Sequence, residues 1–328
     1  TAYSMADIRR WTDQLSLALL KRGYGPGDKI ALVAKSMPEW NIIDLAIQQI
    51  GAVSIPLYPS ITTKDYQYIF QHCESRAIFV GDPELWERVQ PSLEGTHGIE
   101  EVFSIDPIEG LEDWKSLAAQ ASEELRPRME EIMAGIQADD LLTIIYTSGT
   151  TGRPKGVMLS HNNLVSNVEA SLPAVPVDHR HWAVSFLPLC HVFERMIIYL
   201  YLRIGVSTYY AEDISTLGED LKEVKPHLFT TAPRMLEKVY EKIMTKGYDL
   251  PTPQRSLFFW ALNLGKRYLP QKSYGPGYKL QLWLANKLVF KKWRQALGGN
   301  IICVVSGSAA LQPHLARIFW GAQIPILE

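Results

Sequence analysis

Residues 146–156 read Tyr-Thr-Ser-Gly-Thr-Thr-Gly-Arg-Pro-Lys-Gly and bring hydroxyl side chains, glycines and cations into one short stretch. The apolar runs on either side, 141–146 and 157–159, have the composition of buried strands, so the stretch is predicted to be a loop between two strands. Glycine permits positive φ angles and lets backbone N–H groups approach a ligand, and Ser and Thr hydroxyls donate to phosphate oxygens. We infer a phosphate-binding loop in which Lys155 supplies a positive charge.

This loop differs from the P-loop of nucleoside triphosphatases, whose pattern is Gly-x-x-x-x-Gly-Lys followed by Ser or Thr. Counting from Gly149, the second glycine position holds Pro154, and Gly156 stands where the hydroxyl residue is needed. A P-loop also opens onto a helix N-terminus, whereas a strand is predicted to follow here. A plain surface turn is the simpler alternative, but eleven residues of ordered identity argue against it.

The loop resembles the signature loop of the AMP-forming adenylating enzymes, the superfamily of acyl-CoA synthetases, luciferases and peptide-synthetase adenylation domains. The resemblance extends from about Tyr3 to Glu328, and it implies that Thr150 contacts Mg²⁺ and that Lys155 is catalytic. The loop residues that it assigns to ATP binding are Thr147, Ser148, Gly149, Thr150, Thr151, Gly152 and Lys155.

A second cluster, Leu-Pro-Leu-Cys-His-Val-Phe-Glu-Arg at residues 187–195, follows a predicted strand. A lone histidine is more often a structural residue than a functional one. However, the cluster resembles the family's Leu-Pro-Leu-x-His element, whose histidine lies by the substrate carboxylate, and its end is similar to long-chain acyl-CoA synthetases. The resemblance implies a catalytic role for His191. Glu194 and Arg195 are weaker candidates, which could simply pair with each other.

A third cluster, at residues 305–311, ends a predicted strand with side chains too small to obstruct a flat ligand. Composition alone favours a close-packed turn. The family's corresponding Gly-Gly-Ala-Pro-like stretch lines the adenine pocket, with Ser308 here replacing a common glycine and Ala310 a common proline. The resemblance assigns nucleotide binding to Ser306, Gly307, Ser308 and Ala309. The segment 230–235 is similar to the stretch that gates the fatty-acyl tunnel.

The chemistry that the resemblance implies is activation of a long-chain fatty acid by ATP, with Mg²⁺, to acyl-AMP and pyrophosphate, followed by transfer to CoA. A fatty acyl-AMP ligase, an aryl-CoA ligase or a non-catalytic nucleotide-binding module are the alternatives. The family's Gly-Tyr-Gly-x-Thr-Glu element, its ribose-binding aspartate and its lid lysine do not occur up to Glu328. The expectation is a large-domain fragment that lacks the C-terminal lid domain and turns over poorly alone.

Helical and strand patterns alternate along the chain, which predicts an α/β fold of mostly parallel sheets flanked by helices. A length of 328 residues and an apolar content of 47% allow two α/β subdomains. The expected boundaries are 1–136 and 137–328, with the loop in the second subdomain. Residues 82–138 are more polar and are expected to form a connecting layer.

The charge balance and the cysteines limit the environment and the partners. Thirty-three basic against 35 acidic residues argue against a nucleic-acid binder. The cysteines Cys73, Cys190 and Cys303 are scattered, which predicts a reducing compartment with neither a disulfide framework nor a zinc site. The pattern at the N-terminus is not that of a signal peptide, and no apolar run approaches the ~20 residues of a membrane span. A cytoplasmic protein is expected.

Residues 254–298 carry nine basic and no acidic residues, so the rest of the chain has a net charge of −11. Tryptophans interleave with these cations at Trp260, Trp283 and Trp293. Lys287, Lys291 and Arg294 are predicted on one helical edge beside Leu280, Leu284 and Leu288. This pattern is typical of an interfacial helix pair in peripheral contact with an anionic membrane, at its inner face. An ordinary helical hairpin with a solvated basic face accounts for it equally well.

Overall fold

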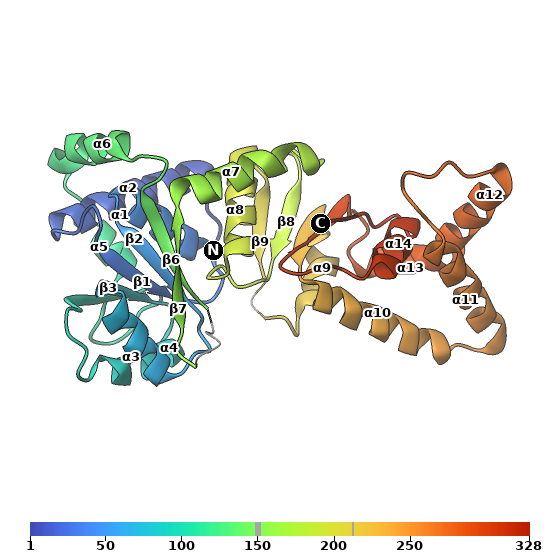
Figure 1. The fold of residues 1–328 in the computed structure, drawn as a ribbon, viewed down its shortest axis with the longest axis horizontal. Coiled ribbons are helices and arrows are strands. Elements are labelled where there is room, and N and C mark those ends of the chain that lie inside the picture. The colour runs from blue at the N-terminus through green and yellow to red at the C-terminus, as the bar shows by residue number, and fades with distance from the viewer. Residues whose placement is uncertain (148–151, 212) are drawn as a thin grey trace. The chain divides into compact units, whose positions relative to one another are not determined.

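The computed structural model describes residues 1–147, 152–211 and 213–328 and divides into two compact units (Figure 1). Unit 1 consists of Thr1–Asn167 and Pro188–Arg195, and unit 2 of Val168–Leu187 and Met196–Glu328. The expected boundary after residue 136 does not coincide with this division. The reason is that the two strands around the phosphate-loop sequence pair with the sheet of unit 1 rather than with that of unit 2.

The described part of unit 1 contains a seven-stranded sheet in the order β5-β4-β3-β1-β2-β6-β7. Neighbouring strands are parallel except β6 and β7, which form an antiparallel pair. The strands are β1 (Lys29–Val33), β2 (Val53–Leu57), β3 (Ser75–Val80), β4 (Glu101–Ser104), β5 (Glu112–Asp113), β6 (Leu141–Thr147) and β7 (Lys155–Ser160). The predicted α/β class with a mostly parallel sheet is therefore confirmed.

Several helices of unit 1 begin at residues whose side chains cap them. At the start of α1, Ser4 accepts a hydrogen bond from the Asp7 amide, and the Asp7 carboxylate accepts one from the Ser4 amide, which forms a capping box. The helices are α1 (Met5–Lys21), α2 (Pro38–Gln49), α3 (Thr63–His72), α4 (Pro83–Val89), α5 (Trp114–Ala118), α6 (Arg126–Gly135) and α7 (His161–Ser171), whose last turn belongs to unit 2. Short 3₁₀ turns occupy Gln90–Leu93, Glu123–Leu125 and Leu172–Ala174.

The sheet of unit 1 is buried on both faces. Successive residues of β1, such as Ala31 and Leu32, point to opposite faces, yet both are inaccessible to solvent. On one face Phe70 of α3 and Leu85 of α4 pack against the strands. The helices α1 and α2 pack against each other, and α2, which carries the buried Trp40, contacts β1 and β2. Burial on both faces is the usual arrangement of a parallel sheet.

The segment 82–138 is more than the connecting layer that its polar composition suggested. Its strands β4 and β5 extend the sheet beyond β3. They escaped prediction because strands of only two to four residues, half polar in β4 and wholly polar in β5, carry little of the alternation that marks a buried strand.

In unit 2 the described residues form a five-stranded, wholly parallel sheet in the order β12-β11-β10-β8-β9. Its strands are β8 (Trp182–Ser185), β9 (Ser207–Tyr210), β10 (Leu228–Thr231), β11 (Cys303–Ser306) and β12 (Ile326–Leu327). The helices that follow α7 are α8 (Val192–Ile204), α9 (Leu217–Val224), α10 (Pro233–Tyr248), α11 (Thr252–Lys266), α12 (Pro276–Ala285), a π-helical turn (Asn286–Phe290), α13 (Lys291–Ala296) and α14 (Pro313–Gly321). The first turn of α8 belongs to unit 1.

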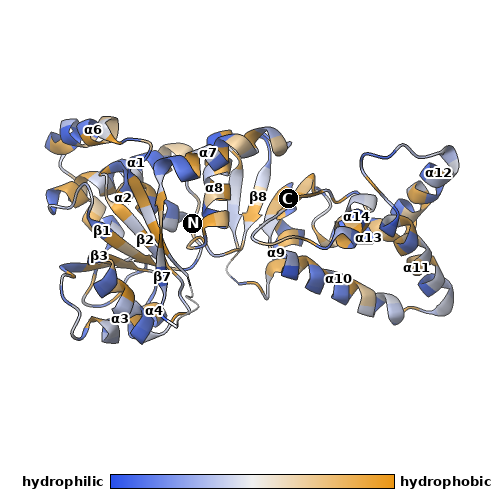
Figure 2. Ribbon diagram, viewed as in Figure 1, coloured by the Kyte–Doolittle hydropathy of each residue, from blue (hydrophilic) through white to orange (hydrophobic). Residues whose placement is uncertain are grey.

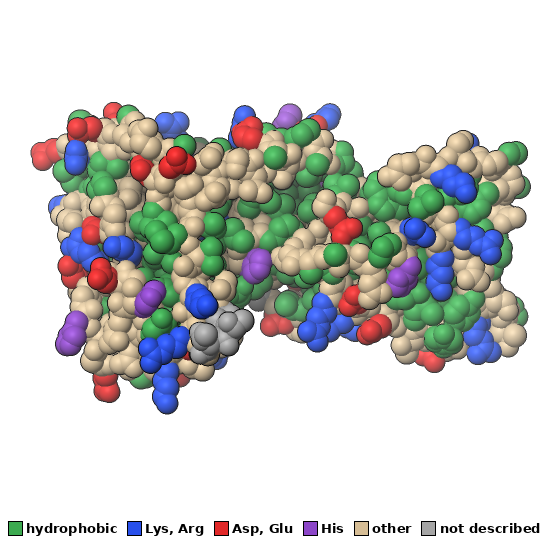
Figure 3. All heavy atoms as spheres, in the orientation of Figure 1, with side chains coloured by type: hydrophobic (Ala, Val, Ile, Leu, Met, Phe, Trp, Pro, Cys, Tyr) green, Lys and Arg blue, Asp and Glu red, His purple; other side chains and the backbone are tan. Residues whose placement is uncertain are grey.

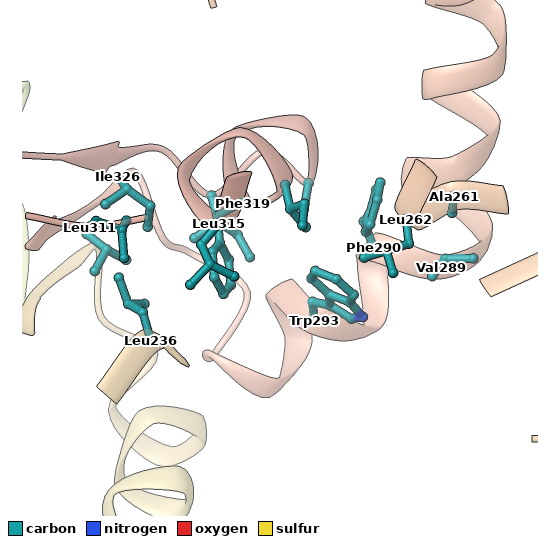
Figure 4. Packing of buried hydrophobic residues seen from close by; sticks show 14 of the residues in the cluster. Leu236, Ala261, Leu262, Val289, Phe290, Trp293, Leu311, Leu315, Phe319 and Ile326 are labelled. Carbon is teal, nitrogen blue, oxygen red and sulfur yellow. The ribbon is translucent and has the colours of Figure 1, made fainter. Parts of the chain in front are cut away.

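The core of unit 2 is built from its helices as much as from its sheet. Figure 4 shows Phe290 and Trp293 between α11 and α14, and Leu311, Leu315 and Ile326 near the strands. The Trp293 ring lies 5.0 Å from that of Phe290 and 6.2 Å from that of Phe319. The helix α10 carries both hydrophobic and hydrophilic residues around its axis, as Figure 2 shows, because only one side packs on this core.

Candidate functional site

The phosphate-loop sequence connects the antiparallel strands β6 and β7, as predicted. Thr147, the last residue of β6, is opposite Lys155, the first residue of β7, and both side chains are exposed. Because β6 runs parallel to β2, the loop starts at the carboxyl edge of the parallel strands, where α/β sheets bind ligands. Ser148, Gly149, Thr150 and Thr151 lie outside the described residues.

Two glycines near the described ends of the loop are there for different reasons. Gly152 has a φ of +85°, in the region that side chains rarely adopt, while no neighbour would obstruct a Cβ. At Gly156 a Cβ would lie 2.7 Å from Cγ2 of Ile144 on the opposite strand. The first glycine therefore serves the backbone conformation and the second allows the two strands to pair closely.

Aromatic side chains contact residues on both sides of the loop. The Tyr146 hydroxyl is hydrogen-bonded to Nδ1 of His72 at the end of α3, 2.7 Å away, and burial raises the pKa of this phenol, which stays neutral. The Arg153 guanidinium stacks 5.6 Å above the ring of Tyr68. Among the described residues, no acidic side chain forms a salt bridge with Lys155. Its charge is thus available to an anionic ligand.

His191 is half-buried directly before α8, and its hydrogen bonding fixes its tautomer. Its Nδ1 accepts a hydrogen bond of 3.2 Å from the Phe193 amide, in the manner of a helix N-cap. Burial lowers the pKa of the imidazole, which favours the neutral ring. A neutral ring whose Nδ1 accepts must carry its proton on Nε2, so His191 presents an N–H donor. Such a donor suits a carboxylate or phosphate oxygen.

The residues before His191 hold the turn in place. The Leu189 amide donates a hydrogen bond of 3.1 Å to the Ser36 hydroxyl, and the His191 amide donates one of 3.0 Å to the Pro188 carbonyl. Cys190 is buried, which raises the pKa of its thiol to about 12. It therefore stays protonated at neutral pH, which disfavours a role as a nucleophile.

Arg195 has a partner that sequence patterns had not indicated. Its guanidinium forms two hydrogen bonds to the Asp44 carboxylate, of 2.9 and 2.7 Å, and a third of 2.8 Å to the Thr143 hydroxyl. Both charged side chains are fully buried. Thr143 in turn donates to the Ser54 carbonyl of β2 at 2.6 Å. One feature of the sequence could have indicated this buried ion pair: Asp44 is the single charged residue within the apolar run 42–47.

The third cluster lies in unit 2, at the carboxyl end of β11. Ser306 is buried, whereas Ser308 and Ala309 are exposed and small. Ser308 has a φ of +71°, in the left-handed region that favours glycine. The hydroxyls of Ser306 and of Thr230 on the neighbouring strand are buried, and neither has a hydrogen-bond partner among the described residues. This edge of the sheet therefore offers two buried hydroxyls that no other described side chain or backbone group engages.

The predicted residues thus fall into two groups. Thr147, Gly152, Lys155 and His191 belong to unit 1, and Ser306, Gly307, Ser308 and Ala309 belong to unit 2. Thr147 ends β6 and Ser306 ends β11, so each lies at the carboxyl end of parallel strands in its own unit, whereas His191 follows β8, a strand of the unit 2 sheet. In the described ranges no three His, Cys, Asp or Glu side chains gather into a metal site.

A surface hollow of about 460 Å³ in unit 1 is a poor alternative site. It is lined by charged side chains, among them Asp28, Glu74 and Arg76. Asp28 and Arg76 already form an ion pair of 2.7 Å with each other. The hollow also lies where β1 and β3 begin, at the edge opposite to the one where parallel sheets bind ligands.

Comparison with known proteins identifies relatives along the whole chain. The model of the family described as AMP-binding enzyme matches residues 1–328. Fatty acyl-CoA synthetase A of Dictyostelium discoideum is 30% identical in an alignment 334 residues long that covers 96% of this chain and 47% of that protein. Long-chain-fatty-acid–CoA ligase 5 of Rattus norvegicus is 30% identical in an alignment 331 residues long that covers 94% of this chain and 47% of that protein. The chain spans about half the length of the curated relatives it matches.

A solved structure has the same fold. The inhibitor-bound N-terminal domain of FACL13 from Mycobacterium tuberculosis superimposes with a TM-score of 0.69 at 17% identity, over 98% of this chain and 67% of that domain.

Proposed function

Because the chain belongs to the AMP-binding enzyme family, we propose that it acts on a long-chain fatty acid, ATP and CoA as an AMP-forming acid–thiol ligase. The long-chain preference is taken from relatives such as the two ligases named above, which are about 30% identical to this chain. The observation that carries the proposal is the hairpin of β6 and β7, with its exposed Lys155 opposite Thr147.

In the proposed first step, a carboxylate oxygen of the fatty acid attacks the α-phosphorus of ATP. The bond from that phosphorus to the bridging oxygen breaks, and pyrophosphate leaves with the bonding electrons. Both reactants are anions, so the main task of the protein is to neutralise charge and align the reactants. In the second step the CoA sulfur attacks the acyl carbonyl, AMP leaves, and the thiol proton is released.

The described residues have chemistry suited to these tasks. Lys155 would bind the departing pyrophosphate together with the loop hydroxyls and amides. The Nε2–H of His191 would donate to an oxygen of the acid, and the neutral ring has no charge to lose on desolvation. The small residues Ser306, Gly307, Ser308 and Ala309 would lie against the purine.

Mg²⁺ is part of the proposal as an ion carried by ATP, with Thr150 as its protein contact. Mg²⁺ keeps several water ligands and is commonly bound through substrate phosphates. A loop rich in hydroxyls and poor in carboxylates fits an ion of this kind, and within the described part of the chain no acidic cluster competes for it. When bound, the ion would neutralise phosphate charge.

We also propose that the protein works in a reducing compartment such as the cytoplasm. Cys73, Cys190 and Cys303 are free and buried. Burial raises the pKa of the Cys303 thiol to about 12, which disfavours the reactive thiolate.

The test is carboxylate-dependent exchange of pyrophosphate into ATP, measured on the full-length protein with a panel of acids from aryl acids to long-chain fatty acids. The proposal expects exchange with long-chain acids and formation of their CoA thioesters. Lys155→Gln should lower exchange by about 100-fold or more, the usual effect of removing one charge-stabilising group. Lys64→Gln, which removes an exposed cation of α3, is the matched control and should leave exchange unchanged.

Undiminished exchange in Lys155→Gln would contradict the role of the loop. Exchange without thioester formation would instead indicate an acyl-AMP ligase, and exchange only with aromatic acids an aryl-CoA ligase. Absence of exchange with every acid would favour a nucleotide-binding module.

A further inference from the structure

The helices that follow α10 lie in a part of the chain with a pronounced charge bias. From Leu250 to Leu327 there are ten Lys and Arg residues and no Asp or Glu. The other residues together carry a net charge of −12, against −2 for the whole chain. On the face drawn in Figure 3, Lys and Arg side chains lie among hydrophobic ones over this part of unit 2. Such a surface attracts anions.

Not every residue of this basic segment takes part in a surface. Arg294 donates hydrogen bonds to the Asn286 side chain at 2.7 Å and to the Ala322 carbonyl at 2.6 Å, and burial lowers its pKa. Trp293 is 8% exposed and belongs to the core, and Trp260 packs against the same core. The prediction that Lys287, Lys291 and Arg294 share one helical edge is therefore wrong for Arg294.

A different set of side chains does reach solvent, and we call it the α12 face. Its apolar members are Leu280, Trp283 and Leu288, which are 60%, 57% and 49% exposed. Its exposed cations are Lys279, Lys287 and Lys291. The spacing 280, 283, 287 follows the helical period, so these three side chains share one side of α12 and the turn that follows it. Lys279, Leu288 and Lys291 are exposed on the same helical segment, 276–296.

The opposite side of this segment already supplies the apolar contact that a surface helix needs. Ala285, Val289 and Phe290 are buried in the core of unit 2 (Figure 4). Three further large apolar side chains on the outside are about half exposed and do not belong to this core. A cluster of this kind marks a surface that contacts something else.

The cations lie close enough to the apolar side chains to act with them. The Lys287 ammonium lies 5.2 Å from the centre of the Trp283 ring, in cation–π contact. A lysine next to an exposed indole matches the boundary between lipid head groups and acyl chains, where Trp sits and Lys extends to the phosphates. No helix in the described ranges could cross a bilayer, so contact of the α12 face would be with the surface of one.

We propose that the α12 face binds the surface of an anionic lipid bilayer, with Leu280, Trp283 and Leu288 inserted among the acyl chains and the lysines on lipid phosphates. The positive charge of the segment fits an anionic partner. The exposed side chains of Leu280, Trp283 and Leu288 favour lipid over nucleic acid as that partner, because a nucleic-acid backbone is bound by charged and polar contacts. Vesicle binding itself is independent of the enzymatic reaction, but the supply of an acyl substrate from that surface rests on the proposed function.

The test is sedimentation of the full chain with vesicles of phosphatidylcholine alone or mixed with phosphatidylglycerol, without ATP or CoA. Binding is expected to the mixed vesicles at about 0.1 M salt and to be lost at about 1 M, where the screening length falls to about 3 Å. K279E/K287E/K291E should lower the partition coefficient by at least about 100-fold. Leu280→Ser with Trp283→Ser should lower it by at least about tenfold.

The matched control is K238E/K242E/K246E, which changes the net charge equally through exposed lysines of α10. It should reduce binding by less than about tenfold, since α10 presents mixed charges and screening limits distant effects. Circular dichroism verifies the fold of each variant.

Equal losses in the two triple variants, or no vesicle binding at low salt, would overturn the proposal. Binding to duplex DNA that survives Leu280→Ser with Trp283→Ser would indicate a general polyanion site and overturn it too. Failure of pyrophosphate exchange leaves these readouts unaffected, so the two proposals fail separately.

Discussion

Arg195 and Asp44 form a bidentate ion pair from which solvent is fully excluded. Arg195 lies in α8, and its amide donates to the His191 carbonyl at 3.2 Å, whereas Asp44 lies in α2. The third hydrogen bond of the guanidinium reaches Thr143 of β6, the strand that leads into the phosphate-binding loop. One buried cation thus fixes the segment of His191 to the strand that carries the loop.

Removing either member of this pair should destabilise the chain strongly. Asp44→Asn or Arg195→Gln is expected to lower the free energy of unfolding in urea by about 3–5 kcal/mol, because each leaves an uncompensated buried charge. Arg128→Gln is the control, since its pair with Glu131 is exposed, and should change that free energy by less than about 1 kcal/mol.

The double variant Asp44→Leu with Arg195→Met distinguishes charge from packing. It should be more stable than either single variant, because no buried charge remains. Additive losses would mean that side-chain volume, not charge pairing, decides the stability here.

Substitutions can distinguish the roles of the two ring nitrogens of His191. In His191→Asn the amide oxygen can take the place of Nδ1 and accept from the Phe193 amide, but the Nε2 donor is lost. Stability should then stay within about 1 kcal/mol of wild type, the value of a helix cap, while pyrophosphate exchange falls by about 100-fold. His191→Ala should lose both. Full exchange in the Asn variant would exclude the donor role.

Acid should destabilise the chain before its carboxylates titrate. Burial lowers the pKa values of His161 and His191 below the ordinary value of about 6.5. Between the lowered and the ordinary pKa the unfolded chain binds more protons, so the free energy of unfolding falls as the pH drops from about 7 to about 5. Urea titrations across this range measure the slope. His161→Asn should flatten it, and substitution of the exposed His97 by Asn should not.

The two loop glycines should respond differently to alanine. Gly156→Ala is expected to cost about 1–3 kcal/mol of unfolding free energy, because its Cβ overlaps Ile144. Adding Ile144→Ala should recover part of that loss. Gly152→Ala should cost about 1–2 kcal/mol through its positive φ alone, and Ile144→Ala should not rescue it. Rescue of both variants would contradict this assignment.

Ser308 offers a stabilising substitution. Its φ of +71° strains any residue with a side chain, so Ser308→Gly should raise the free energy of unfolding by about 1 kcal/mol. Ser308→Ala keeps the Cβ and should give no gain. A destabilised glycine variant would mean that the serine hydroxyl outweighs the strain.

Local signals in the sequence predicted the elements that local chemistry determines. The strands around residues 146–156 are confirmed, because apolar runs act over a few residues. The boundary between the units was not predictable in this way. It depends on β6 pairing with β2, some 90 residues earlier in the chain, and no local pattern encodes such a pairing.

The candidate site shows the same division. Residue types and order indicated the loop and His191, but the partner of Arg195 lies 151 residues away in the sequence. The exposed α12 face was predicted only in part, since the π-helical turn at Asn286–Phe290 shifts the helical phase and Arg294 turns into the core. Pairings across long sequence separations and phase shifts within helices require the three-dimensional structure.

The division of unit 1 into two stretches of chain also bears on how the molecule is made. A ribosome adds about 5–20 residues each second, so synthesis of Val168–Leu187, which separates the two stretches, and then of Pro188–Arg195 takes a few seconds. During that interval the strands of the nascent sheet can pair, but the Asp44 carboxylate cannot form its ion pair because Arg195 has not been synthesised. We therefore expect the first 167 residues to form a partly folded intermediate, accessible to chaperones, until Arg195 is synthesised and pairs with Asp44.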